Sequence, residues 1–212
     1  MAEVDTSVLV AGLERAWAQI RARHSQVPAA VLVIAAGSQG KRLKWGHFAA
    51  GRWNRADADC PEVLVGGEGL RRPAAEVLAT LLHEAAHGLA HTRGVQDTSR
   101  QGRYHNRRYR ALAQELGLEV AEVGTIGWSA TRLPEDTADR YADVLADLAG
   151  CLRLWRHAEP RHPAGRARNL LACACGCPRR IRVAPATLAV APILCAACTQ
   201  PFTPDDPLVI GA

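Results

Sequence analysis

The segment His83-Glu84-Ala85-Ala86-His87 combines residue types and a spacing that could perform metal-dependent chemistry. On an α-helix, residues four apart lie one turn above each other on one face, so both imidazoles can reach a single Zn²⁺ ion at about 2.0–2.1 Å. Glu84 is offset from the ligands, beside the metal, where its carboxylate can accept a proton from water that the metal activates. The pattern is typical of zinc-dependent peptidases when it lies on a helix. We predict that His83 and His87 bind zinc and that Glu84 is the catalytic base.

A catalytic zinc ion usually has three protein ligands and one open position, so a third ligand must be found. His91 lies four residues further along, but three such residues span about 12 Å of rise on a straight helix and cannot converge on one ion. His105 lies beyond Gly94, at the expected start of the next helix, and a turn can bring it back to the pair. We predict His105 as the third ligand. The alternative is a solvated histidine in an arginine-rich run.

Five of the seven cysteines fall within residues 173–198, a concentration that favours a metal site over disulfides in a cytoplasmic protein. Cys195 and Cys198 form a C-x-x-C pair, and Cys173, Cys175 and Cys177 lie upstream. Four thiolates around zinc would close a tetrahedral site and fold a unit too small to fold by apolar burial. Five cysteines compete for four positions, so the spacing leaves the upstream pair open. A redox cluster and unpaired thiols are the alternatives.

Residues 62–118 resemble the SprT-like zinc metallopeptidase family, the Spartan-related enzymes. The matching segments are Pro61-Glu62-Val63-Leu64-Val65-Gly66-Gly67-Glu68-Gly69-Leu70, Thr80–His87, Gly102–Tyr109 and Ala111–Gly117. The family has a His-Gly pair at the third ligand, where this chain has His105-Asn106. The resemblance implies a zincin-like fold, zinc ligation by His83, His87 and His105, catalysis by Glu84, and a protein substrate on or near DNA.

The cysteine-rich region extends this resemblance, because SprT-like proteins often carry a C-terminal zinc ribbon whose first half reads Cys-x-Cys-Gly. Cys173-Ala174-Cys175-Gly176 matches that pattern. The resemblance therefore implies Cys173, Cys175, Cys195 and Cys198 as ligands of a structural zinc ion, with Cys177 as a substitute for one of the upstream pair.

The elements that must position these residues give an α+β pattern. Apolar residues at helical spacing predict helices, and β-branched runs between turn residues predict strands. Pro73 and Gly94 suit the start and the end of the helix that carries the first two ligands. The helices are expected over 7–23, 73–93, 105–116 and 134–155, and the strands over 30–36, 45–53, 62–65, 180–183 and 189–191.

We expect three parts: a metallopeptidase domain over 1–156, a linker rich in Pro, Arg and Gly over 157–169, and a small zinc-ribbon β unit over 170–212. Charge separates them. Residues 1–150 carry 18 Lys/Arg and 18 Asp/Glu, whereas residues 151–212 carry eight Arg and three acidic residues and so account for the whole net charge of +5. A basic region of this kind favours an anionic partner. We predict DNA binding there; arginines that only keep the chain in solution are the alternative.

The sequence also bears on the compartment. The N-terminus has no basic segment followed by an apolar one, and the most apolar run, 27–37, is too short to span a bilayer and contains Pro28. With 48% hydrophobic and 22% charged residues, the composition is that of an ordinary globular protein. We expect a cytoplasmic protein without a membrane partner.

Two functions fit these motifs. The first is a zinc-dependent hydrolase that cleaves peptide bonds, with Glu84 as base. The second is a non-catalytic zinc protein that binds nucleic acid. Glu84 favours the enzyme, because a purely structural zinc site needs no carboxylate beside the metal and is usually closed by four protein ligands.

Overall fold

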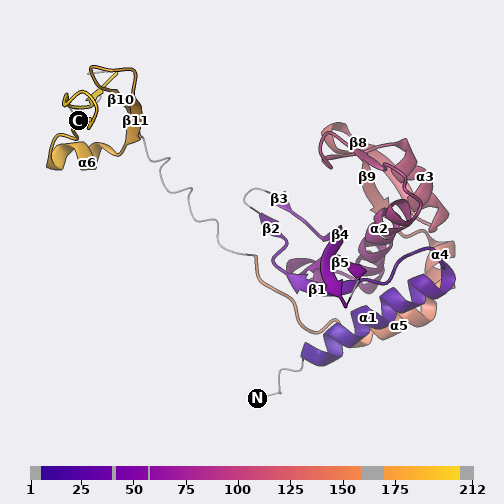
Figure 1. Cartoon of the computed structure of the whole chain (residues 1–212). Coiled ribbons are helices and arrows are strands. Elements are labelled where there is room, and N and C mark those ends of the chain that lie inside the picture. The colour runs from indigo at the N-terminus through magenta and orange to yellow at the C-terminus, as the bar shows by residue number, and fades with distance from the viewer. Residues whose placement is uncertain (1–5, 40–41, 57, 159–169, 206–212) are drawn as a thin grey trace, which may run out of the picture. The chain divides into compact units, whose positions relative to one another are not determined.

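The structure is a computed structural model that describes residues 6–39, 42–56, 58–158 and 170–205. The chain divides into two units, Met1–Glu159 and Pro160–Ala212. Both mix helices with small sheets, so the predicted α+β class is confirmed (Figure 1). Apart from residues 157 and 158, the predicted linker lies outside the described residues. Among the helices of the described ranges, none has the length and apolar composition of a membrane span.

The larger unit begins with a helix and a three-stranded sheet. Its first elements are α1 (Thr6–Arg23), β1 (Val31–Ala35), β2 (Ser38–Gln39), β3 (Arg42–Leu43), β4 (Gly46–Arg55) and β5 (Ala58–Gly66). The sheet has the order β1-β5-β4, with β1 parallel and β4 antiparallel to β5. Strand β4 is therefore an edge strand, and β5 is its partner in the described sheet.

Helix α2 (Ala74–Thr92) follows the short helix η1 (Gly67–Arg71) and contacts β4, α1, α3, α5 and β9. It forms because Pro73 precedes an apolar stripe and Gly94, at φ +61°, terminates the chain's helical path. The stripe is fully buried and consists of Val77, Leu78, Leu81, Leu82, Ala85 and Leu89. This packing anchors one face of α2, so the predicted ligands on the other face have a rigid support.

A second sheet, in the order β6-β7-β9-β8, lies on another side of α2 (Figure 1). Its elements, with the helices between them, are β6 (Thr98–Ser99), β7 (Tyr104–His105), α3 (Arg107–Glu115), β8 (Glu119–Val123), η2 (Gly124–Ile126) and β9 (Gly127–Arg132). His105 thus lies in a short strand and not at the start of a helix, because Asn106 caps α3 one residue later. Gly127, at the start of β9, allows β7 and β9 to lie close together, because a Cβ at this position would lie 2.2 Å from the His105 carbonyl oxygen.

The expected helix over 134–155 is two helices, α4 (Glu135–Arg140) and α5 (Ala142–Cys151). The break occurs at Tyr141, which is 2% exposed and has the Arg23 guanidinium over its ring. Tertiary packing of Tyr141 therefore overrides the continuous helical pattern. After α5, Arg156 binds back to the unit: its N–H donates to the Gly67 carbonyl at 3.0 Å, and its guanidinium pairs with buried Glu68 at 3.1 Å.

The smaller unit contains β10 (Leu171–Ala174), β11 (Arg180–Val183), α6 (Pro185–Val190) and β12 (Thr203–Pro204), with the sheet order β11-β10-β12. The strand predicted over 189–191 is wrong, because Pro185 starts a helix at its first position and that helix runs to Val190. The core of the smaller unit is small and is centred on Cys173, Cys195 and Phe202.

Candidate metal centres

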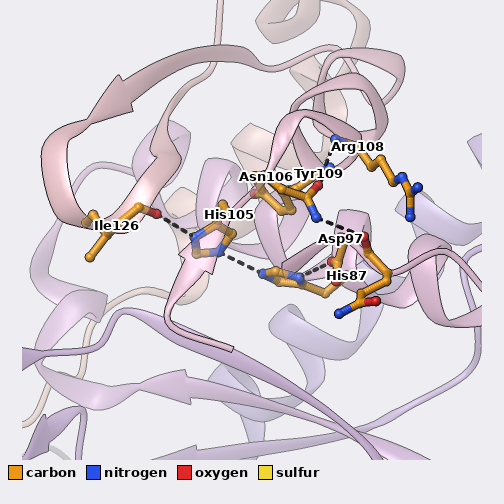
Figure 2. A network of polar contacts seen from close by, with 8 residues as sticks. His87, Asp97, His105, Asn106, Arg108, Tyr109 and Ile126 are labelled. Carbon is orange, nitrogen blue, oxygen red and sulfur yellow. Dashed lines mark hydrogen bonds and ion pairs between the residues drawn. The ribbon is translucent and has the colours of Figure 1, made fainter. Parts of the chain in front are cut away.

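His83, His87 and His105 come together as predicted, two from α2 and one from β7. Their ligand atoms all lie within 4.8 Å of one another, and no fourth residue joins the group within the described ranges. The Nε2 atoms of His87 and His105 face each other 3.1 Å apart (Figure 2). Two nitrogens bound to one tetrahedral zinc ion are separated by about 3.4 Å. The spacing is therefore close to that of a zinc site.

The other ring nitrogen of each histidine has a partner. His87 Nδ1 lies 2.5 Å from Asp97 Oδ2, and His105 Nδ1 lies 3.3 Å from the Ile126 carbonyl oxygen (Figure 2). His83 Nδ1 lies 3.3 Å from the Thr131 hydroxyl. Partners of this kind fix the tautomer and orientation of a metal-binding imidazole and leave Nε2 for the metal. Asp97, Thr131 and Ile126 were not predicted, because each is brought to the site by a different loop or strand.

Tyr109 of α3 packs against all three imidazoles. Its ring centroid lies 5.0, 4.7 and 4.5 Å from those of His83, His87 and His105, and its side chain is fully buried. The Asn106 cap at the start of α3 and the buried face of that helix place the ring there. Tyr109 therefore acts as a packing residue beneath the imidazoles.

Glu84 lies beside the imidazoles and is 4% exposed. Strand β4 crosses directly over it: a Cβ on Gly46 would lie 2.5 Å from Glu84 Oε1, and the backbone N–H of Phe48 donates to the carboxylate. Burial raises the pKa of Glu84 from 4.5 to about 7 and outweighs the opposite effects of His87 and Phe48. A carboxyl group with a pKa near neutrality suits a proton acceptor that must later release its proton.

Burial also sets the protonation of the imidazoles. It lowers the pKa of His83 well below its usual value and that of His105 to about 4, so both rings are neutral at pH 7. For His87, burial acts in the same direction, but the hydrogen bond with Asp97 and the Glu84 carboxylate outweigh it and raise the pKa. A metal ion would take the place of a proton on this ring. Two neutral imidazoles and one carboxylate-supported imidazole fit the ligand chemistry of Zn²⁺.

Two cavities meet at this group and share Gly46, His83 and Glu84 as lining residues. One has a volume of about 690 Å³ and extends along α2 and β9 past Trp45 and Leu133. The other has about 490 Å³. Its further lining residues include Lys44, His47, His87, His91, Asp97 and His105. The candidate centre is thus open to space on two sides.

A second group consists of Cys175, Cys177, Cys195 and Cys198, whose sulfur atoms lie within 4.8 Å of one another. The Sγ atoms of Cys177 and Cys195 are 3.8 Å apart, close to the distance of about 3.8 Å between two thiolates on a tetrahedral zinc ion. Backbone N–H groups of Ala197 and Cys198 lower the pKa of Cys195 to about 6, which favours the thiolate. This donor set fits a closed structural zinc site.

The structure replaces Cys173, one of the four predicted ligands, with Cys177. Cys173 lies inside strand β10, paired with Ile181 and Pro204, and its side chain is fully buried in the small core. Cys175 and Cys177 lie beyond the end of β10, in the turn toward β11, where a Cys-Gly-Cys segment can point two thiols to one side. The sequence contains this signal, since residues 175–177 are the only upstream pair joined by a glycine.

Some of the arginines predicted to bind DNA have other partners. Arg156 is paired with Glu68 in the larger unit, and Arg180 is paired with Asp205 in the smaller one. Arg161, Arg166 and Arg168 lie outside the described residues.

No protein-family model, curated protein or solved structure matches the chain.

Proposed function

We propose that the chain is a zinc-dependent hydrolase of peptide bonds, with a zincin-like catalytic unit related to the SprT-like family and a structural zinc ribbon. The observation that carries this proposal is the group of three converging imidazoles with the buried Glu84 carboxylate beside them. Three nitrogen donors leave a coordination position for substrate or water, whereas a structural zinc site is usually closed by four ligands.

The roles of the residues follow from this arrangement. When bound, a zinc ion would polarise the peptide carbonyl and make water a better nucleophile at neutral pH. Glu84 would accept a proton from the attacking water and pass it to the departing amine. Burial raises the pKa of Glu84 to about 7 in the metal-free chain, which favours uptake of the proton, whereas a bound metal ion would lower this pKa and favour its release. His83, His87 and His105 would hold the metal.

A polypeptide substrate is supported by what surrounds the group. The two cavities extend from Glu84 in different directions, so an extended chain could continue on either side of the bond to be cleaved. Edge strand β4 passes over Glu84, and its outer edge could form backbone hydrogen bonds with such a chain. The resemblance to SprT-like proteins adds the expectation that the substrate is a protein on or near DNA.

The test is incubation of the zinc-loaded full chain with a DNA-binding protein, such as a histone, with and without DNA. We expect cleavage by the unmodified chain and a loss of about 10²–10⁴-fold for Glu84→Gln at unchanged zinc content. Fragments that form equally with the variant would show a contaminating protease. No cleavage under any condition would leave the non-catalytic zinc protein as the better description.

A further inference from the structure

Asn106 occupies the position where the resembled family has glycine. It makes five hydrogen bonds, one of which is the helical bond from the Arg110 N–H to its carbonyl at 3.2 Å. Its side-chain oxygen accepts from the backbone N–H groups of Arg108 at 2.8 Å and Tyr109 at 3.2 Å. Its side-chain nitrogen donates to the Gln96 carbonyl at 2.9 Å, and its backbone N–H donates to the Asp97 carbonyl at 3.0 Å (Figure 2). One residue therefore joins the start of α3 to the segment that follows α2.

These bonds connect parts of the metal group that come from different elements. Asn106 directly follows His105, and its cap fixes the helix that carries Tyr109 beneath the three imidazoles. On the other side it holds the backbone of Asp97, whose carboxylate is the Nδ1 partner of His87. Asp97 lies outside any helix or strand, so its position depends on such contacts.

We infer that Asn106 is a positioning residue of the histidine metal site, and that it acts by holding Asp97 against His87. The inference rests on the proposed function only in requiring that the three histidines bind a metal. It assigns a role to the departure from the family pattern. Asn106 holds the backbone of residues 96 and 97, and the Asp97 carboxylate orients the second ligand, His87. The third ligand, His105, directly precedes Asn106.

The chemistry of the amide makes the role separable from helix capping. Asparagine, serine and aspartate cap helices about equally well, because each offers an oxygen to the first backbone N–H groups. Only the asparagine side chain also carries the N–H₂ donor that reaches Gln96. Asn106→Ser therefore keeps the cap and the backbone bond to the Asp97 carbonyl, and it removes the side-chain bond to the Gln96 carbonyl. Asn106 is half-buried, so the substitution leaves the core of α3 intact.

The test measures zinc affinity in the full chain by competition with a chelator. In the chain loaded with Co²⁺, the sulfur-to-metal absorption identifies the phase of the titration in which the cysteine site loses its metal. The other phase then belongs to the histidine site. We expect Asn106→Ser and Asp97→Asn each to weaken zinc binding there by about 10–100-fold, the range for residues that support metal ligands. The cysteine site and the melting temperature of the metal-free Asn106→Ser chain should stay unchanged.

The double variant decides whether Asn106 works through Asp97. If it does, Asp97→Asn combined with Asn106→Ser weakens binding no more than the stronger single change, because both remove the same support. A matched control is Glu115→Gln, which breaks an exposed ion pair to Arg93 at 2.7 Å, also between the ends of α2 and α3 but away from the histidines. It should leave zinc affinity unchanged.

Three results would overturn the inference. One is an Asn106→Ser chain that binds zinc as tightly as the unmodified chain. Another is a double variant whose loss equals the product of the two single losses, which would mean that the residues act independently. A chain that holds no metal at the histidine site would remove this inference and the proposed function together, whereas tight zinc binding without cleavage would remove only the latter.

Discussion

The carboxyl group of Glu84 is buried between α2 and β4, and its pKa rises from 4.5 to about 7. A folded-state pKa above the unfolded one means that the folded chain binds this proton more tightly. The stability that Glu84 contributes is therefore present below about pH 4.5 and is lost as the pH rises to 7 and beyond. A metal ion beside the carboxylate acts in the opposite direction, so the effect belongs to the metal-free chain.

We expect metal-free Glu84→Gln to be more stable than the metal-free unmodified chain at pH 8, because the amide carries no buried charge. A change from 4.5 to about 7, at about 1.4 kcal/mol for each pH unit, sets the difference at up to about 3 kcal/mol. The difference should shrink as the pH falls towards 4.5. Urea unfolding of both chains across this pH range measures the difference in the free energy of unfolding. A difference independent of pH would contradict the raised pKa of the buried Glu84 carboxyl group.

Gly46 gives Glu84 its place under the edge strand. A Cβ at this position would lie 2.5 Å from Glu84 Oε1, so Gly46→Ala must push the end of that side chain aside. We expect the rate of hydrolysis to fall by at least about tenfold while zinc content stays the same, because the proton acceptor moves and the ligands do not. The matched control is Gly150→Ala, at an exposed position of α5 where a Cβ meets nothing within 4 Å. Equal rates for the two variants would show that Glu84 tolerates displacement.

At the scale of elements, α2 is the part of the molecule that the sequence predicts best. Its apolar stripe and the residues at its ends set its bounds, and the i, i+4 spacing sets the orientation of His83 and His87. The supports of these ligands could not be predicted in the same way. Asp97 follows α2, Ile126 ends η2 and Thr131 lies in β9, and their positions depend on strand pairing between residues far apart in the sequence.

His91 and His105 provide a test of the third ligand. His105 belongs to the converging group, whereas His91 lies a turn further along α2, with its ring 5.9 Å from that of Phe48. We expect His105→Ala to lose the zinc of the larger unit during purification and His91→Ala to retain it. Elemental analysis of both proteins measures this, and the reverse ranking would show that the third ligand is wrongly assigned.

The turn between β10 and β11 shows why strand ends matter for the cysteine site. Spacing alone could not choose among three upstream cysteines, because the choice depends on where β10 ends. We expect two zinc ions per unmodified chain, one per Cys177→Ala chain and two per Cys173→Ala chain, since Cys173 belongs to the small core. Elemental analysis counts them. Loss of zinc from Cys173→Ala alone would restore the ligand set implied by the family resemblance.

At the scale of the whole molecule, some of the arginines of residues 151–212 form ion pairs within their own unit. Arg156 holds the end of the larger unit to Glu68, and Arg180 pairs with Asp205, so both are less available to a phosphate than the sequence predicts. Arg153, Arg179 and Arg182 have no ion pair within the described residues.

We expect the full chain to bind DNA in a salt-dependent way and a chain of residues 1–159 to bind at least tenfold more weakly, because phosphate contacts by arginine release counterions. The shorter chain keeps Arg156, so its fold should be preserved. Fluorescence anisotropy with one duplex at two salt concentrations measures the difference. Equal affinity of the two chains would place any DNA binding in the larger unit.

The facing nitrogens of His87 and His105 belong to residues 18 positions apart in the chain. A metal held by both is therefore a reversible cross-link that closes a loop, and it restricts the unfolded chain as other cross-links do. The loop includes an exposed turn in which Arg100 and Gln101 adopt left-handed backbone conformations, at φ 51° and 59°. We expect that loss of the metal removes this closure and lets the exposed turn unfold locally, which would make it a better substrate for proteases that cut after basic residues. Under the proposed function, zinc supply would then govern the lifetime of the protein as well as its activity.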